Sequence, residues 1–184
     1  MINDWDNIEI FTENQSMLTE TSYDDGNSEY MTELKVPVID FDNVKEQYLQ
    51  RIGCQDESLT SVDALLSKAN CNVFIEFKNG SLAKKEVRLG IYSKIQDSLL
   101  MLCDITDNHI SQLRQCLDFI LVYNEEKNPS KSSNKSKDYI NDRIMELGGK
   151  ELVRFGISRY AGVYFRKVHT YNVEKFEEYI SKFK

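Results

Sequence analysis

The segment NVFIEFK, residues 72–78, determines the predicted fold of this chain. Its pattern is typical of a half-buried strand, with Glu76 and Lys78 on one face and apolar residues such as Ile75 on the other. Asn79-Gly80 follows as a turn signal. A second apolar run, CLDFILVY at residues 116–123, is typical of a buried strand.

Helical patterns surround and separate these strands. Between them, the apolar stripe of residues 84–103 predicts a helix. We also expect strands at 61–66 and 162–170, helices near 42–52, 107–115, 138–147 and 173–183, and a polar loop at 124–137. This alternation predicts an α/β fold with a mixed central β-sheet flanked by helices.

The charge of the chain is divided unevenly. Residues 1–34 hold nine acidic residues and no Lys or Arg, whereas the other 150 residues hold all 23 basic and 21 acidic ones. We therefore expect an acidic N-terminal arm at 1–35, partly disordered, and a single α/β domain at 36–184. The alternative for the arm is a segment that covers a basic surface or docks on a partner.

Composition argues against several classes of protein. No apolar run approaches the roughly 18 residues of a membrane span, and the N-terminus lacks the pattern of a secretory signal. The four cysteines have no C-x-x-C spacing and there are two histidines, which favours free thiols over a disulfide frame or a zinc site. We expect a cytoplasmic protein that does not bind membranes.

Asp63, Glu76 and Lys78 are the residues most able to carry chemistry. If the strands at 61–66 and 72–78 are neighbours, Asp63 can lie beside Glu76. The two carboxylates would then repel, and each would raise the pKa of the other unless a cation came between them. Mg²⁺ commonly takes one or two carboxylates plus waters. Lys78 would orient a metal-bound water or stabilise charge on an attacked phosphate. The alternative is a surface Asp63 and a structural Glu76–Lys78 pair.

These residues and their spacing resemble the core motif of the PD-(D/E)XK, or restriction-endonuclease-like, nuclease superfamily, over about residues 42–124. The resemblance implies a mixed sheet flanked by helices, Asp63 and Glu76 as ligands of Mg²⁺ or Mn²⁺, and Lys78 as an aid to phosphodiester hydrolysis. It departs from the family at Ala64, where a proline is often found. The resemblance also implies DNA or RNA as the partner, and it leaves open whether the protein is a homodimer.

The same resemblance adds three weaker candidates for substrate contact. Glu46 on the first helix, and Arg88 and Gln96 on the helix after the second strand, match positions from which related nucleases reach the site or the nucleic acid. The alternative for all three is an exposed, solvated helix face.

Two functions from different classes follow. The first is a metal-dependent nuclease, by analogy in prokaryotic defence, mobile-element or repair biology. The second is a non-catalytic acidic immunity or antitoxin protein that neutralises a basic toxin, which a pI near 5.0 and the acidic arm would suit. A third possibility is a nucleic-acid-binding subunit whose motif no longer cuts.

Overall fold

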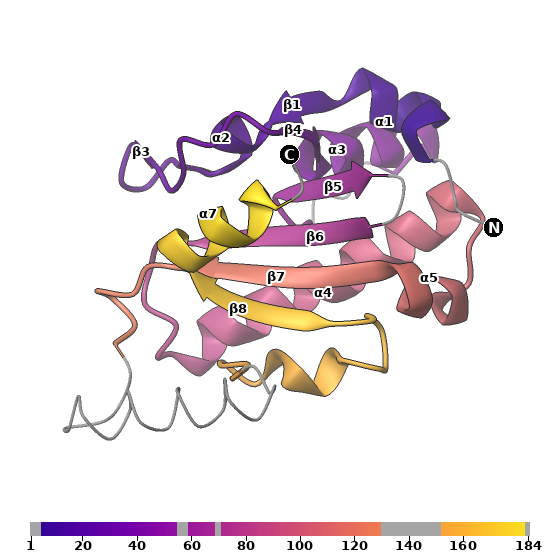
Figure 1. Cartoon of the computed structure of the whole chain (residues 1–184). Coiled ribbons are helices and arrows are strands. Elements are labelled where there is room, and N and C mark those ends of the chain that lie inside the picture. Colours follow the sequence, from indigo (N-terminus) through magenta and orange to yellow (C-terminus); the bar gives the residue numbers. More distant parts are fainter. Residues whose placement is uncertain (1–4, 55–58, 69–70, 130–151, 183–184) are drawn as a thin grey trace.

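The computed structural model describes residues 5–54, 59–68, 71–129 and 152–182 of the chain. Its core is a six-stranded mixed sheet, which confirms the predicted α/β class (Figure 1). The strand order across the sheet is β1 (Gln15–Met17), β4 (Pro37–Asp40), β5 (Ala64–Lys68), β6 (Cys71–Lys78), β7 (Leu117–Tyr123) and β8 (Val168–Asn172).

The sheet changes direction at β6. From β1 to β6 neighbouring strands are antiparallel, whereas β6, β7 and β8 run parallel to one another. The parallel pairing of β6 and β7 requires a crossover connection, which α4 (Lys85–Thr106) and α5 (Ile110–Cys116) provide. The segment 72–78 therefore lies inside the sheet, as its apolar pattern indicates.

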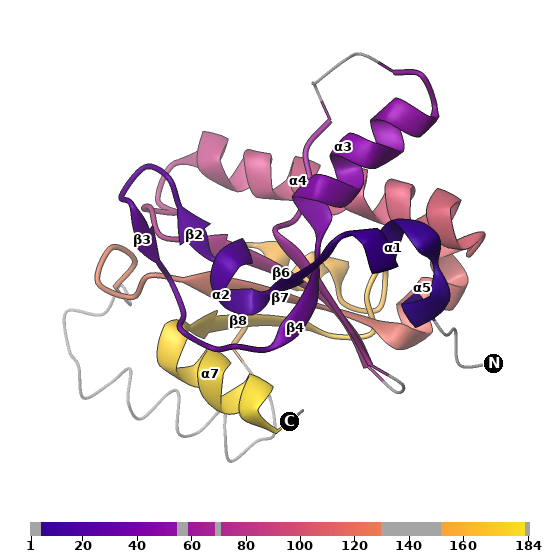
Figure 2. The ribbon, with the colours of Figure 1, turned by 90° about the horizontal axis from the view of Figure 1, so that it is seen from above.

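Helices cover both faces of the sheet. Viewed from above, α4 lies on one side and α7 (Val173–Ser181) on the other, with the strands between them (Figure 2). On the α4 side also lies α3 (Phe41–Arg51), whose first turn is capped by the Asp40 carboxylate accepting from the backbone N–H of Asn43.

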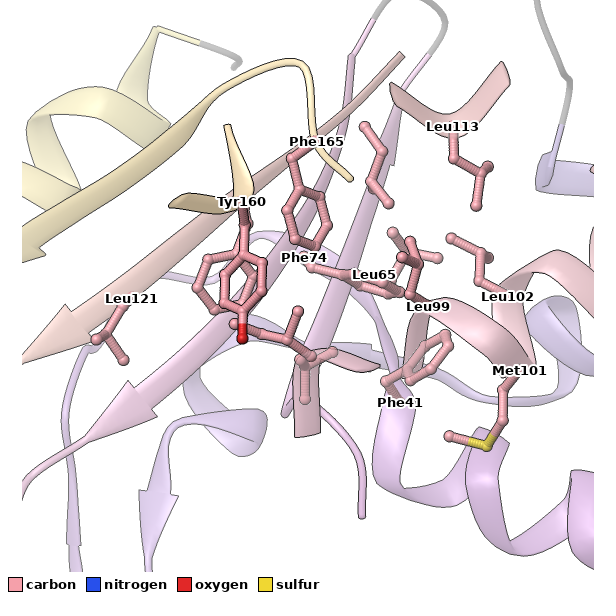
Figure 3. Packing of buried hydrophobic residues seen from close by; sticks show 14 of the residues in the cluster. Phe41, Leu65, Phe74, Leu99, Met101, Leu102, Leu113, Leu121, Tyr160 and Phe165 are labelled. Atoms are coloured by element: carbon pink, nitrogen blue, oxygen red, sulfur yellow. The ribbon is translucent and has the colours of Figure 1, made fainter. Parts of the chain in front are cut away.

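Each face of the sheet has its own hydrophobic core. On the α4 face, the rings of Phe41 and Phe74 meet edge to face at 4.9 Å, and Leu99 and Leu102 of α4 pack nearby (Figure 3). On the α7 face, Phe77 of β6 meets Phe176 at 5.5 Å. The predicted alternation along β6 is thus confirmed, and it places Glu76 on the α4 side.

The acid-rich N-terminal segment belongs to both cores. It contains the 3-10 turn η1 (Trp5–Asn7), α1 (Glu9–Glu13), the edge strand β1, α2 (Leu18–Thr21) and a hairpin of β2 (Tyr23–Asp24) and β3 (Glu29–Tyr30). Trp5 and Phe11 are buried on the α4 face, and Leu18 on the α7 face. From Trp5 onward these residues do not form an arm separate from the body.

Several boundaries differ from the predicted ones. The predicted strand at 61–66 begins only at Ala64, because Thr60 and Val62 donate their backbone N–H groups to side chains of α4. The first part of the predicted strand at 162–170 is a turn that extends to Phe165, and Gly162 in this turn has φ near 71°. The turn follows the 3-10 helix η2 (Ile157–Tyr160), and β8 comes after it.

Some sequence predictions find no test here. The predicted helix at 138–147 and most of the loop at 124–137 lie outside the described residues.

Among the described helices, none combines the length and apolar character needed to cross a membrane. The thiols of Cys54, Cys103 and Cys116 are free.

Candidate functional site

The two predicted carboxylates lie side by side at one end of the β5–β6 hairpin. Ala64 pairs with Ile75, so Asp63, directly before β5, faces the end of β6 that carries Glu76. The backbone N–H of Phe77 donates a 2.6 Å hydrogen bond to Asp63 Oδ2. The antiparallel register of two neighbouring strands is therefore what brings the pair together.

Lys94 of α4 contacts both carboxylates on the α4 face of the sheet. Its Nζ donates to Asp63 Oδ1 at 2.9 Å and to Glu76 Oε2 at 3.0 Å, and it lies 2.9 Å from Glu76 Oε1 as well. The predicted Lys78 is farther away, with its Nζ 3.7 Å from Glu76 Oε1. The site thus contains two carboxylates and two ammonium groups, so its formal charges balance.

The carboxylates lie at the buried bottom of the site, and the two lysines lie at its more exposed rim. The Glu76 side chain is fully buried and Asp63 is 15% exposed, whereas Lys94 and Lys78 are 22% and 33% exposed. A ligand approaching from solvent would therefore meet the lysines first. The carboxylates lie behind them, where the low dielectric strengthens their attraction for a cation.

The loop before β5 holds Asp63 in place through contacts with both neighbouring helices. The Ser98 hydroxyl accepts the buried N–H of Val62 at 2.8 Å, and Asp97 Oδ2 accepts both the N–H and the hydroxyl of Thr60. From the α3 side, the N–H of Phe41 donates to the carbonyl of Asp63. These hydrogen bonds replace the strand pairing that the loop lacks, and they fix the position of the backbone that carries the Asp63 side chain.

Burial shifts the protonation of the site toward fewer charges. Desolvation, and then the negative charge of Asp63, raise the pKa of Glu76 to about 8, although Lys94 and Lys78 oppose the shift. Desolvation also raises the pKa of Asp63, against the charge of Lys94 and the N–H of Phe77. Burial lowers the pKa of Lys94, but the charges of Glu76 and Asp63 outweigh it and raise that pKa, so the ammonium stays charged.

A divalent cation fits the chemistry of this pair. Glu76 Oε1 is buried and accepts no hydrogen bond of good geometry within the described chain, but it lies 2.9 Å from Lys94 Nζ and 3.7 Å from Lys78 Nζ, so two ammonium groups neutralise it when no metal is bound. Across the described residues, no group of three or more His, Cys, Asp or Glu side chains gathers in a form able to hold a metal. Water and substrate would supply the remaining ligands, which is the usual situation for Mg²⁺.

The three weaker candidates do not join the carboxylates. Arg88 turns back to donate to the backbone carbonyls of Leu82 and Ala83, which directly precede α4. Gln96 and Glu46 are exposed on their helices. The carboxylate of α3 whose charge acts on Asp63 is Asp42, which also accepts a hydrogen bond from Ser61 and raises the pKa of Asp63.

Lys94 is the site residue that the sequence prediction missed. Its signal was present, because Ile91, Lys94 and Ser98 recur at helical spacing on the face of α4 that also buries Ile95 and Leu102. A lysine on the buried face of an amphipathic helix needs a buried anion as partner. Asp63 and Glu76 are the anions that the chain offers, and the sequence prediction did not pair Lys94 with them.

The basic and aromatic residues near the C-terminus are engaged within the fold. The guanidinium of Arg154 lies over the rings of Tyr123 and Phe155 at 4.8 and 4.7 Å and donates to the carbonyl of Asn128. Arg166 forms a two-pronged pair with the buried Asp118, at 2.9 and 2.8 Å. These two arginines therefore have structural partners.

Comparison with known proteins adds no family to this geometry. No family model, curated protein or solved structure matches the chain.

Proposed function

We propose that this protein is a metal-dependent nuclease, in which Asp63 and Glu76 hold Mg²⁺ or Mn²⁺ and the substrate is a nucleic acid phosphodiester. The observation that carries the proposal is the pairing of a buried glutamate with a nearly buried aspartate, whose oxygens converge on a single cation position that Lys94 Nζ occupies. Burying two carboxylates together is costly, and a fold that served only stability would gain more from apolar side chains there.

The residues around the pair support the same chemistry. A bound divalent ion would supply Lewis-acid activation of water and neutralise charge on the attacked phosphate. Glu76, fully buried on a central strand, would provide a rigid anchor. Lys78 lies at the rim with its Nζ near Glu76 Oε1, so its ammonium would orient the phosphate and stabilise the negative charge that develops there.

Cleavage by matched variants tests the proposal. We expect the wild type to cut labelled single- or double-stranded DNA or RNA in Mg²⁺ or Mn²⁺, and Glu76→Gln and Asp63→Asn to lose at least about a hundredfold in rate, which corresponds to about 2.7 kcal/mol of barrier. Glu174→Gln, an exposed carboxylate on the opposite face of the sheet, is the matched control.

Two outcomes of this assay would contradict the proposal. The first is cleavage that survives in both carboxylate variants. The second is a folded wild type that cuts none of the four substrate classes in either metal.

A second candidate is the non-catalytic acidic protein that binds a basic toxin. It is favoured by the hairpin of β2 and β3, where Asp25 and Glu29 are exposed and the Tyr23 and Tyr30 rings, 4.9 Å apart, are each 44% exposed. Exposed tyrosines and carboxylates are suited to a basic partner. A wild type that cuts nothing, yet binds a basic nuclease domain less tightly after Asp25→Asn and Glu29→Gln, would support this function.

A further inference from the structure

Lys94 lies where a cation shared by the two carboxylates has to lie. Its Nζ is within 3.0 Å of Asp63 Oδ1 and of both oxygens of Glu76. A metal ion that both carboxylates ligate would need the same space, because Mg²⁺ binds oxygens at roughly 2.0–2.1 Å. The ammonium and the ion therefore exclude each other from the position between the carboxylates.

The balance of charge leads to the same conclusion. With Asp63 and Glu76 ionised, Lys94 and Lys78 already neutralise the site. Adding a divalent ion while Lys94 stayed in place would leave two excess positive charges beside a fully buried glutamate. Like charges at such short range in a poorly solvated site repel strongly. Departure of Lys94 would remove one of these charges and free both carboxylates.

The position of Lys94 permits that departure. The residue is on α4 at the rim, its side chain is 22% exposed, and its ammonium is carried on a flexible four-carbon stem. Once released, the ammonium would remain next to the carboxylates on the solvent side. A phosphate approaching the site would be the natural anion for it to meet.

We propose that Lys94 is a displaceable internal cation, which occupies the carboxylate pair in the metal-free protein and swings out to the substrate phosphate when a divalent ion enters. This inference rests on the proposed function, because it assumes that Asp63 and Glu76 bind a metal. It adds that metal entry and phosphate binding are coupled through one side chain. The bound metal delivers Lys94 to the substrate, and the substrate phosphate in turn favours the metal-loaded state.

Lysine reactivity in the folded wild-type protein gives the direct test. Limited acetylation with an N-hydroxysuccinimide ester at fixed pH, read by mass spectrometry, reports how accessible each lysine is and how readily it deprotonates to the neutral amine that attacks the ester. We expect saturating Mg²⁺ to raise the acetylation rate at Lys94 at least fivefold. The rate at Lys175, an exposed lysine on the opposite face of the sheet, should stay the same.

Calorimetric titration of Mg²⁺ into two variants gives a second readout. Lys94→Met removes the competing ammonium, so we expect Mg²⁺ to bind at least tenfold more tightly, which is about 1.4 kcal/mol. Lys78→Met removes an equal charge that does not lie between the carboxylates. A general electrostatic effect would therefore tighten binding equally in both variants, whereas displacement requires a clearly larger effect at Lys94.

The outcomes separate this inference from the proposed function. If Mg²⁺ binds to the wild type and needs Asp63, but the acetylation rate at Lys94 does not rise, displacement is wrong and the metal site stands. If Mg²⁺ binds only to Lys94→Met, Lys94 is a permanent occupant and displacement is wrong. If Mg²⁺ binds to none of these proteins, the metal-dependent function and the inference both fail. The acetylation readout needs no variant, so it holds even if Lys94→Met folds poorly.

Discussion

At the scale of single residues, the candidate site is a buried ion cluster in which each member depends on the others. Lys94 is the only residue whose ammonium contacts both carboxylates among the described ion pairs. Removing one partner from a buried pair leaves an uncompensated charge, which costs far more than the intact pair contributes. The stability of the metal-free protein should therefore be most sensitive at this position.

Substituting Lys94→Met should lower the free energy of unfolding of the metal-free protein by about 3–5 kcal/mol, because the buried Asp63 and Glu76 lose the one ammonium that contacts both of them. Urea denaturation in EDTA measures this. The double variant Lys94→Met with Glu76→Gln should recover part of the loss, since only one carboxylate then remains. A loss no larger than that of Lys175→Met would contradict the ion-cluster interpretation.

The pH dependence of stability should carry the signature of Glu76. Burial and the charge of Asp63 raise its pKa in the folded protein to about 8, above the value of roughly 4.3 expected when unfolded. The folded state therefore holds the proton more tightly. Its contribution to stability is complete below the unfolded pKa and is lost as pH rises toward 8.

Urea denaturation between pH 5 and 9 in EDTA, compared with Glu76→Gln, isolates this contribution. The wild type should lose stability relative to the variant as pH rises, and the two curves should run parallel above the folded pKa. Parallel curves over the whole range would show that the glutamate is ionised throughout.

At the scale of elements, two helices act as a frame for a loop rather than as mere covers of the sheet. Residues 60–62 precede β5 and bond to Asp97 and Ser98 of α4, while Phe41 of α3 binds the carbonyl of Asp63. The position of the Asp63 carboxylate therefore depends on where both helices hold this loop.

Substituting Ser98→Ala should lower stability by about 1–3 kcal/mol, because the buried N–H of Val62 loses its acceptor. It should also weaken Mg²⁺ binding, since Asp63 directly follows Val62. Chemical denaturation and calorimetry measure the two effects. Ser93→Ala, on the exposed face of the same helix, is the control and should change neither.

Much of this element scale was predictable from the sequence. The alternation of residues 72–78 and the apolar run at 116–123 predicted the two central strands, because a pleated strand buried in a sheet has few other patterns. The stripe of residues 84–103 predicted α4 for the same kind of reason. From strand adjacency, the sequence also predicted that Asp63 and Glu76 would meet.

The remainder depends on contacts between distant segments. Strand β5 begins later than predicted, since side chains of α4 satisfy the loop before it. Arg88 misses the site because nearby backbone carbonyls of the turn before α4 accept its hydrogen bonds. Lys94 was missed because its partners lie on two strands of the sheet, and periodicity alone does not say which anion a buried lysine meets.

At the scale of the whole molecule, the acid-rich N-terminal segment is a structural part of the fold. Strand β1 pairs with β4 and covers that edge of the sheet, and Trp5, Phe11 and Leu18 complete the cores on both faces. Among the described residues of the segment, most acidic side chains are exposed, so its charge faces solvent while its apolar side chains pack into the cores.

Truncation in this segment should therefore unfold the protein rather than uncover a basic surface. Phe11→Ala should cost about 3–5 kcal/mol, as expected for a fully buried aromatic ring. Thermal and urea denaturation measure the loss. The neighbouring Thr12→Ala is exposed and should cost far less. Equal stability of the two variants would mean that the segment does not contribute to the core.

From the connectivity of the sheet we also expect an order in which the site comes together as the chain folds. The two carboxylates lie on one antiparallel hairpin, whose ends meet by closing a short loop, whereas Lys94 arrives only when the long crossover helix docks. In stopped-flow refolding we expect Glu76→Gln to fold faster than the wild type, while Glu174→Gln should not. The barrier to folding would then include the approach of two like charges that have not yet met their counterion.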